Sequence, residues 1–457
     1  MKKIVIVLFV FVICASLIFG IYNIKSVDSL MRPPKLGGEN SLIQQAFDET
    51  VSESDGIIMK NPLDGKYTST YLFYDLNNDG LDEALVFYSD LTDDNMACVN
   101  IFKKTNNEWS FVSKIKGKSE EVYQVDFADF NSDGICEILL SWKAVEPIDS
   151  LNSPDFSLLG NRLLSIYSYN ETSTTLLKSE HYSNYYIDDF DANDSDDLFL
   201  VNISLSDQEK KTSGRLISFC DDYSISQDIS IALTGMLNVF NIVSDNVIEN
   251  NKEISRIFID GFISENAVIT EVVNIVQDSF EVSLPLYEQN QSLQPSTLRD
   301  SRSISFDFDN DGEVEIPTLE KLPHSELVLK DSNEKGQLNL TVWHNLIKSR
   351  LTVDAKCIYS SSFKYMFIFP DEWINEITAV YDYNNDTLTF YYVDSSDKTD
   401  NWIMSIKAFY TSNWEKDNLD YISFTDSSTY IYGYKFYDND TKEDYIEYID
   451  SNFLVIV

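Results

Sequence analysis

The segment Asp75-Leu-Asn-Asn-Asp-Gly-Leu-Asp-Glu83 decides the fold class of this chain, because similar segments recur three more times. The other copies are Asp129-Phe-Asn-Ser-Asp-Gly-Ile-Cys-Glu137, Asp189-Phe-Asp-Ala-Asn-Asp-Ser-Asp-Asp197 and Asp307-Phe-Asp-Asn-Asp-Gly-Glu-Val-Glu315. Positions 1, 3 and 5 of every copy are Asp or Asn, position 6 is Gly in three copies, and position 9 is an acid. Recurrence of one element along a chain is typical of repeat architectures.

The spacing of these oxygen-bearing side chains favours calcium. Calcium takes about six to eight oxygen ligands at roughly 2.3–2.6 Å, and alternate side chains of a tightly curled loop converge on one point. A glycine at position 6 permits the sharp turn, and the acid at position 9 closes the shell from the start of the next strand. The predicted ligands are Asp75, Asn77, Asp79, Glu83, Asp129, Asn131, Asp133, Glu137, Asp189, Asp191, Asn193, Asp197, Asp307, Asp309, Asp311 and Glu315.

Two other kinds of loop deserve comparison with this pattern. An EF-hand places its closing acid at position 12, where this chain has Val86, Leu140, Leu200 and Thr318. Metal-free hairpin turns of the Asp-Gly or Asn-Gly type are the open alternative. Metal binding is favoured over them, because a metal-free loop would crowd several carboxylates without compensation.

Apolar or aromatic segments enter and leave the loops, and a hairpin follows three of them. The expected strand pairs are Val99–Lys103 with Trp109–Ile115, Leu163–Tyr169 with Thr175–Ser179, and Arg215–Cys220 with Ser224–Ile229. Each loop with its hairpin then makes a unit of four strands, as in a propeller blade.

The spacing between loops predicts one unit without ligands. The interval from the third loop to the fourth is about twice the earlier intervals, so a ligand-free unit is expected near residue 248, with the hairpin Ile269–Leu284. The predicted fold is mainly β. An irregular or incomplete β-propeller of about five units occupies residues 61–320, and a smaller β-rich or α+β domain follows over 325–457.

A loop that closes with an acid at position 9 between strands resembles the FG-GAP/VCBS repeat class, which includes the calcium-bearing blades of integrin-like propellers. With Met31–Lys35, Pro62–Gly65 and Phe369–Trp373, most of the chain resembles exported Firmicutes proteins described as VCBS-repeat-containing or lipoprotein-like. The resemblance implies a calcium-stabilised propeller on the cell surface, with no assigned catalytic activity and with the ligands named above. Asp194, at position 6 of the third loop, departs from the pattern.

The composition bounds the possible partners. The chain of 457 residues has a net charge of −41, and aromatic residues make up 13% of it. Aromatic side chains favour strands. A surface this acidic repels phosphate backbones, so no nucleic-acid partner is expected. Bound cations would offset the self-repulsion of so many acids.

The N-terminus predicts export and membrane attachment. Two lysines precede the uncharged run Ile4–Tyr22, which is long enough to cross a hydrocarbon core of about 30 Å. No clear cleavage site follows it, so residues 1–25 are interpreted as an uncleaved signal anchor rather than a cleaved signal peptide. A lipoprotein modified at Cys14 is the alternative, although its lipobox is poor. The bulk of the chain is expected on the extracytoplasmic face of the cell membrane.

Residues 26–60 are expected to form a linker and a short helix over Ser41–Val51. The remaining cysteines, Cys98, Cys136, Cys220 and Cys357, lack zinc-type spacing,. They are expected to be buried free thiols rather than disulfides.

The C-terminal region lacks the loop and is rich in tryptophan. The strands expected there include Tyr365–Phe369, Ile377–Tyr383, Leu388–Val393, Ile403–Phe409 and Tyr430–Tyr437. Tyr381–Asp386 and Asp438–Asp440 are interpreted as turns. Four tryptophans, Trp343, Trp373, Trp402 and Trp414, are expected to pack in a core, with a sugar-stacking platform as the alternative.

No enzymatic activity is expected. The chain has three histidines, His181, His324 and His344, and none lies in a Ser/His or Cys/His signature,. A carboxylate-pair glycosidase or a calcium-assisted lyase acting on polysaccharide stays the minor alternative. The expected function is a cell-surface calcium-binding β-repeat protein that acts as a binding or adhesion module for cell-wall glycan or a surface protein. A structural scaffold of the envelope is the second possibility.

Overall fold

The chain forms two compact units in the structure, which is a computed structural model. The first comprises Met1–Ala128, Gly134–Val145 and Leu163–Glu180, and the second comprises Asp129–Asp133, Glu146–Arg162 and His181–Val457. The structure describes residues 38–51, 56–92, 94–143, 162–205, 210–249, 251–276, 279–283, 286–287, 297–300, 303–325, 338–348, 350–374, 376–382, 386–393, 402–418, 420–437 and 442–456. The expected anchor Ile4–Tyr22 and the turn Asp438–Asp440 lie outside these residues.

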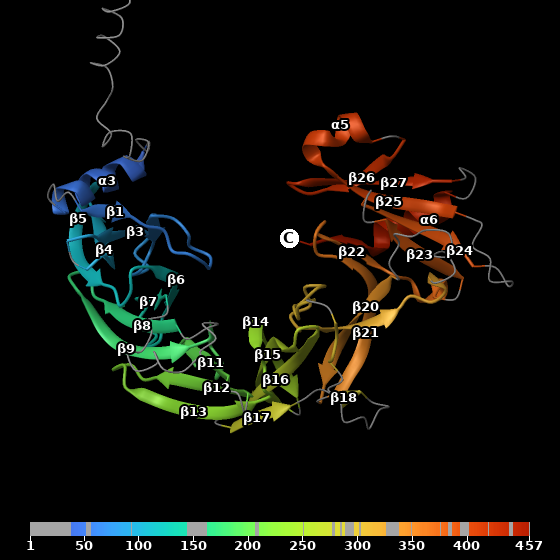
Figure 1. Ribbon diagram of the computed structural model, residues 1–457. Helices are drawn as coiled ribbons and strands as arrows, with labels where there is room; N and C mark the ends of the chain where they lie inside the picture. The colour runs from blue at the N-terminus through green and yellow to red at the C-terminus, as the bar shows by residue number, and fades with distance from the viewer. Residues whose placement is uncertain are drawn as a thin grey trace, which may run out of the picture. The chain divides into compact units, whose positions relative to one another are not determined.

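The first unit begins with α3 (Glu39–Thr50), where the sequence predicts a short helix (Figure 1). The helix buries Ile43 and Phe47, and the Phe47 ring meets Tyr88 edge-on with the ring centroids 5.0 Å apart. Among the described residues no helix is both long and apolar enough to cross a membrane.

Two antiparallel sheets follow α3. The first sheet has the order β1-β3-β4-β5 with β2 beside β3, and the second has the order β6-β7-β8-β9. The strands are β1 (Ile57–Met59), β2 (Tyr71–Tyr74), β3 (Glu83–Asp90), β4 (Met96–Thr105), β5 (Glu108–Lys116), β6 (Val122–Ala128), β7 (Glu137–Trp142), β8 (Arg162–Tyr169) and β9 (Thr174–Tyr182). The hairpins predicted after the first and second loops are confirmed as β4–β5 and β8–β9.

The second unit opens with two four-stranded antiparallel sheets, ordered β10-β11-β12-β13 and β14-β15-β16-β17. The strands are β10 (Asn184–Asp188), β11 (Asp197–Leu205), β12 (Lys210–Phe219), β13 (Ile225–Leu233), β14 (Asn238–Glu249), β15 (Lys252–Ser264), β16 (Ala267–Val276) and β17 (Ser279–Ser283). The pairing of β12 with β13 confirms the third predicted hairpin. The sheet β14–β17 is the four-stranded unit that the spacing predicts near residue 248, and β14 turns directly into β15 without a loop of the repeated kind.

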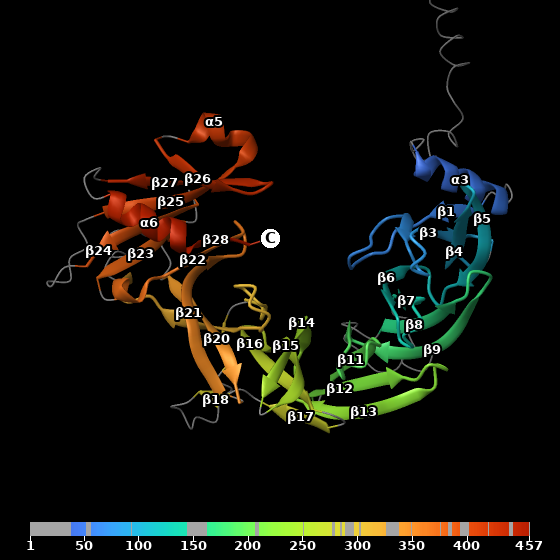
Figure 2. The same ribbon diagram turned by 180° about the vertical axis from the view of Figure 1, so that it is seen from behind.

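Two further sheets complete the second unit. One has the order β19-β20-β21-β22-β28 with β18 beside β21, and the other has the order β23-β24-β25-β27-β26; Figure 2 shows β28 next to β22. The strands are β18 (Leu286–Tyr287), β19 (Ile316–Lys321), β20 (Asn339–Ile347), β21 (Arg350–Ser360), β22 (Tyr365–Ile368), β23 (Ile377–Asp382), β24 (Thr387–Tyr392), β25 (Trp402–Tyr410), β26 (Ile422–Asp426), β27 (Tyr430–Phe436) and β28 (Phe453–Val455). The short helices α5 (Trp414–Asp417) and α6 (Lys442–Asn452) accompany them.

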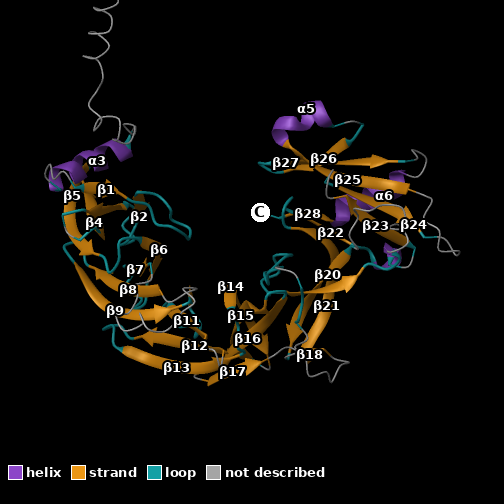
Figure 3. Ribbon diagram, viewed as in Figure 1, coloured by secondary structure: helices purple, strands orange, loops and turns teal. Residues whose placement is uncertain are grey.

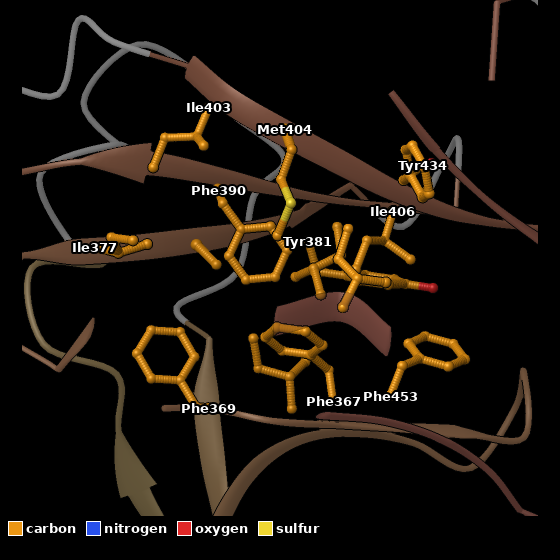
Figure 4. Close-up of a cluster of buried hydrophobic side chains, with 14 of the residues drawn as sticks. Phe367, Phe369, Ile377, Tyr381, Phe390, Ile403, Met404, Ile406, Tyr434 and Phe453 are labelled. Atoms are coloured by element: carbon orange, nitrogen blue, oxygen red, sulfur yellow. The ribbon is translucent and has the colours of Figure 1, made fainter. Parts of the chain in front are cut away.

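A large apolar core joins the last two sheets. Side chains from β22 and β28 meet those of β23, β24 and β25 (Figure 4). Phe367 lies 5.2 Å from Phe390 between ring centroids, and the buried Trp373 packs on both Phe367 and Phe369. Trp373 therefore confirms the expected core role, as does Trp343, which is fully buried in a separate cluster. Trp402 and Trp414, for which the same role is expected, are only half-buried.

The fold is mainly β, with several antiparallel sheets and three helices among the described residues (Figure 3). The sheet that begins with β19 continues through β20 to β22, across the boundary expected at 320–325. Cys98, Cys136, Cys220 and Cys357 form no disulfide, as expected. Cys98 and Cys357 are buried as expected, whereas Cys136 is half-buried and Cys220 is exposed.

Candidate metal centres

All four loops close an antiparallel pairing in the same register. The residue before position 1 pairs with the acid at position 9, which opens the following strand or directly precedes it. The pairs are Tyr74 with Glu83, Ala128 with Glu137, Asp188 with Asp197, and Phe306 with Glu315. The expectation that the closing acid stands at the start of the next strand is therefore confirmed.

The aspartate at position 1 holds the curl of the loop. In the fourth loop Asp307 accepts hydrogen bonds from the backbone N–H groups of Asp311 (3.1 Å) and Gly312 (2.9 Å). Asp75 and Asp189 accept the corresponding two bonds in the first and third loops. The loop backbone thus orients the side chain of one predicted ligand by hydrogen bonds alone.

Two positions of each loop adopt the left-handed backbone conformation. Position 4 has φ of 55° at Asn78, 54° at Ser132, 56° at Ala192 and 63° at Asn310. Position 6 has φ of 84° at Gly80, 80° at Gly134, 94° at Gly312 and 67° at Asp194. A residue with a side chain is disfavoured there by roughly 1–2 kcal/mol. The third loop therefore keeps the common backbone in spite of Asp194.

Carboxylates of the third and fourth loops converge. In each cluster, one oxygen from each of three residues lies within 4.8 Å of the others. The clusters are Asp189, Asp191 and Asp197 in the third loop, and Asp307, Asp309 and Glu315 in the fourth. Each cluster can hold a metal ion. Asp311, at position 5, lies outside its cluster and instead accepts a hydrogen bond from the N–H of Glu313 at 2.8 Å.

The first two loops differ from the third and fourth at position 3, because they carry asparagine there instead of aspartate. Asn77 Nδ2 donates to Asp79 (3.2 Å) and to Glu171 (3.4 Å). Within the described ranges, three-acid clusters come from the third and fourth loops. The residues of the second loop are divided between the two compact units after Asp133.

The closing acid of the fourth loop is buried with one oxygen unsatisfied. Glu315 is 0% exposed; its Oε2 accepts the N–H of Phe308 at 3.1 Å, and its Oε1 has no hydrogen-bond partner. Burial, and then the charges of Asp309, Asp311 and Asp307, raise the pKa of Glu315 to about 8. A buried acceptor without a partner is unfavourable, and a cation in the cluster would supply one.

The corresponding acids of the first and third loops are buried in the same way. Asp197 accepts the N–H of Phe190 at 3.0 Å. Its other oxygen lacks a partner of good hydrogen-bond geometry, although the nearby Ser218 hydroxyl offsets part of the pKa rise. Burial raises the pKa of Asp197 to about 7, and it likewise raises that of Glu83 to about 7.

The backbone N–H at position 8 ties a loop to the repeat before it. Cys136 donates to the carbonyl of Leu76 in the first loop (2.7 Å), and Asp196 donates to the carbonyl of Asp129 in the second (2.9 Å). The Asp196 carboxylate also accepts the N–H of Asp129 at 2.8 Å. Successive loops are therefore linked directly.

The repeat before the fourth loop, β14–β17, lacks a loop of the repeated kind. A side-chain carboxylate there accepts the hydrogen bond that a loop carbonyl accepts in the earlier repeats. The position 8 residue, Val314, donates its N–H to Asp245 Oδ2 on β14 at 2.7 Å. Asp245 forms a buried two-bond ion pair with Arg256 on β15. Arg256 also donates to the Leu346 carbonyl (2.6 Å) and lies 3.4 Å from Glu313.

Sequence reasoning missed Asp196, Asp245 and Arg256. A usable signal for Arg256 is its place in the apolar stretch of β15, because a charged residue in a buried strand needs a partner,. The identity of that partner was not accessible, since it depends on the register of β14 against β15.

No known family model matches this chain. A search of curated proteins finds no match either. Two solved structures share a weak likeness. A levansucrase variant from B. megaterium is 8% identical, with 72% of this chain and 94% of that chain covered and a TM-score of 0.24. An exo-β-1,3-galactanase from Phanerochaete chrysosporium is 10% identical, with coverage of 77% and 80% and a TM-score of 0.27. Likenesses of this size assign no function to the chain.

Proposed function

We propose that the four loops bind calcium and that the chain is an exported β-repeat protein of the FG-GAP/VCBS type with propeller-like units. The observation that carries the proposal is the buried Glu315 Oε1, which lacks a partner and belongs to the cluster with Asp307 and Asp309. A dication in that cluster would neutralise the converging carboxylates. It would also coordinate Glu315 Oε1, the oxygen that has no hydrogen-bond partner.

The donor set favours calcium over other metals. The predicted ligands are all oxygens from Asp, Asn and Glu, which suits hard cations and not zinc or copper. Magnesium requires near-octahedral geometry and loses its water reluctantly, whereas calcium accepts irregular shells with more ligands. The ligands would be positions 1, 3, 5 and 9, as predicted from the sequence, with position 5 turning from its backbone contact to join them.

Tethered outside the membrane by its N-terminus, the protein would act as a binding or adhesion module for cell-wall glycan or a surface protein. The strongly acidic composition and the lack of a recognisable catalytic signature support this role. Extracellular calcium modules commonly bind with Kd of about 10⁻⁴–10⁻³ M, so such sites would be filled outside the cell.

Calorimetric titration of the metal-free protein with calcium tests the metal assignment. We expect several sites in the range given above and weaker binding of magnesium. Glu315→Gln keeps the shape of the side chain and its bond to Phe308 but removes the charge, so it should weaken one site and leave the others. If neither the wild-type protein nor this variant takes up calcium, the loops are metal-free hairpin turns.

A glycan array and a polysaccharide-degradation assay, each with calcium and with chelator, test the role. Binding without turnover supports the module. Cleavage of a polysaccharide would replace the proposal with the hydrolase or lyase alternative.

A further inference from the structure

The outer face of the sheet β23-β24-β25-β27-β26 contains a cavity of about 370 Å³. It lies far along the chain from the four loops, in the region where the sequence left open whether aromatic residues pack in a core or form a platform. Small-molecule sites commonly have volumes of about 300–1,000 Å³, so this cavity suits a compact ligand such as a single sugar unit.

Strand register explains which side chains line the cavity. Inward-facing residues of β24 and β25, such as Leu388, Phe390 and Ile406, are fully buried in the core. The alternate residues face outward and stand in rows across the sheet, since Thr389 pairs with Ser405 and Ser405 pairs with Lys435.

A wall of the cavity depends on a glycine. Gly433 stands opposite Lys407 in the sheet. A Cβ atom on Gly433 would lie 3.1 Å from Tyr421 and 3.3 Å from Trp414. The missing side chain therefore lets Tyr421 lie over the strands, where it lines the cavity. Tyr391 and Trp402, a pair in the register of β24 and β25, are the other aromatic residues of the lining.

The polar floor is held in place by its own hydrogen bonds. Trp402 Nε1 donates to Ser405 Oγ at 3.1 Å, and Ser405 Oγ lies 3.0 Å from Thr389 Oγ1. Ser405 is only 3% exposed. Hydroxyls fixed in this way are oriented before a ligand arrives, which lowers the entropy lost on binding.

The charged residues of the lining are two lysines, Lys407 and Lys435, and one aspartate, Asp382. Lys407 and Lys435 line the cavity from neighbouring strands in diagonal positions, with one residue pair, Ile406 and Tyr434, between them. Lys407 Nζ lies 5.1 Å from the Phe409 ring centroid, and Lys435 Nζ lies 3.5 Å from the highly exposed carboxylate of Asp420. Two lysines beside one aspartate give this lining a net positive charge, on a chain with 75 acids and 34 basic residues, and this charge favours an anionic ligand.

We propose that this cavity binds a sugar ring that bears a carboxylate, as in a uronic acid. The ammonium groups of Lys407 and Lys435 would receive the carboxylate. The C–H face of the ring would lie on an aromatic side chain, whose π face is negative, and the floor hydroxyls with Asp382 would bond the ring hydroxyls. The site is separate from the four loops, so sugar binding can be tested independently of calcium binding.

Titration of the full-length protein with D-glucuronate and D-galacturonate, followed by calorimetry and tryptophan fluorescence, tests the proposal. Either uronate should bind at least tenfold more tightly than the matching neutral sugar, glucose or galactose. Added salt should weaken the binding, because screening acts on an exposed ion pair. Lys407→Met and Lys435→Met should each lower the affinity about tenfold. Lys321→Met, which removes an exposed lysine on β19 outside the cavity, should leave it unchanged.

Three results would overturn the proposal. Equal binding of neutral sugar and uronate would remove the role of the lysines, and equal binding of acetate would remove the role of the ring. Absence of binding by both uronates, in a protein whose melting curve is normal, would reject the site itself. Calcium uptake, measured on the same preparation, separates each of these results from failure of the metal assignment.

Discussion

The fourth loop and the sheet β14–β17 contain buried carboxylates in two different settings. In the sheet, Asp260 is 0% exposed and is neutralised by Arg299, whose Nη2 lies 2.8 Å away. Asp245 is paired in the same way with Arg256. In the fourth loop Glu315 is equally buried, but its Oε1 has no partner and further acids surround it.

The difference shows which repeat needs something from outside the chain. Burying a charge is expensive unless it is paired. In the repeat without a loop, arginine side chains neutralise the buried aspartates: Arg256 on β15 pairs with Asp245, and Arg299 pairs with Asp260. The predicted ligand positions of the fourth loop carry only acids, so the stability of that repeat should depend on calcium. Each prediction below tests that contrast.

Removal of calcium should have the largest effect. A ligand that binds only the folded state adds about 2.7 kcal/mol per site at a concentration a hundredfold above Kd, and four sites add together. We expect a large drop in melting temperature in EDTA, reversed by calcium more fully than by magnesium. Superimposable melting curves in EDTA and in millimolar calcium would show that the loop-bearing repeats do not depend on calcium.

Arg299→Met should destabilise the second unit by about 3–5 kcal/mol, since it leaves Asp260 buried without its cation. The loss should be the same in calcium and in EDTA, as measured by chemical denaturation. Arg215→Met is the matched control: Arg215 also makes a two-bond pair, with Asp228, but both side chains are partly exposed. This control should cost less than about 1 kcal/mol. If the loss of stability in Arg299→Met depended strongly on calcium, the distinction between arginine-paired and metal-dependent carboxylates would be wrong.

Asp309→Ala should lower stability in calcium by about 2–3 kcal/mol, and Asp191→Ala by about 1 kcal/mol. The fourth loop offers four charged ligands around Gly312, whereas the third has Asn193 at position 5 and the strained Asp194. Thermal melts of both variants measure the ranking, and in EDTA both should lie close to the wild type. Equal damage in EDTA would show that the carboxylates serve the turn rather than a metal.

The smallest effect concerns pH in the metal-free protein. The pKa of Glu315 is raised to about 8, so its stabilising contribution is fully present below its unfolded value near 4.5 and is lost as pH rises through 8. Raising the pH from 7 to 8 in EDTA should therefore cost up to about 1 kcal/mol from this group. Glu315→Gln should flatten that part of the profile. Calcium should flatten it as well, because the ion competes with the proton. An unchanged slope in the Gln variant would assign the pH dependence to other acids.

The four loops could be predicted residue by residue because their contacts are local. Position 1 bonds to the N–H groups of positions 5 and 6, and the acid at position 9 to the N–H of position 2, all within nine residues. The ligand-free sheet β14–β17 could be placed from spacing alone. The sequence predicted a domain boundary near 320–325, but β19 and β20 pair across it. The pairing was not predictable because a long connection separates the two strands.

The sequence by itself determined the mainly β class, the loop positions and the hairpins that follow them, since alternating apolar residues and turn-forming residues act over short distances. Only the tertiary structure decided which loops gather three carboxylates, which aspartates receive an arginine, and which aromatic residues face outward on the sheet of β23–β27. These outcomes depend on the register between strands, and a shift of one residue in register exchanges the buried and exposed faces of a strand. Spacing along the chain carries the local chemistry, whereas neutralisation of buried charge requires partners that only folding brings together.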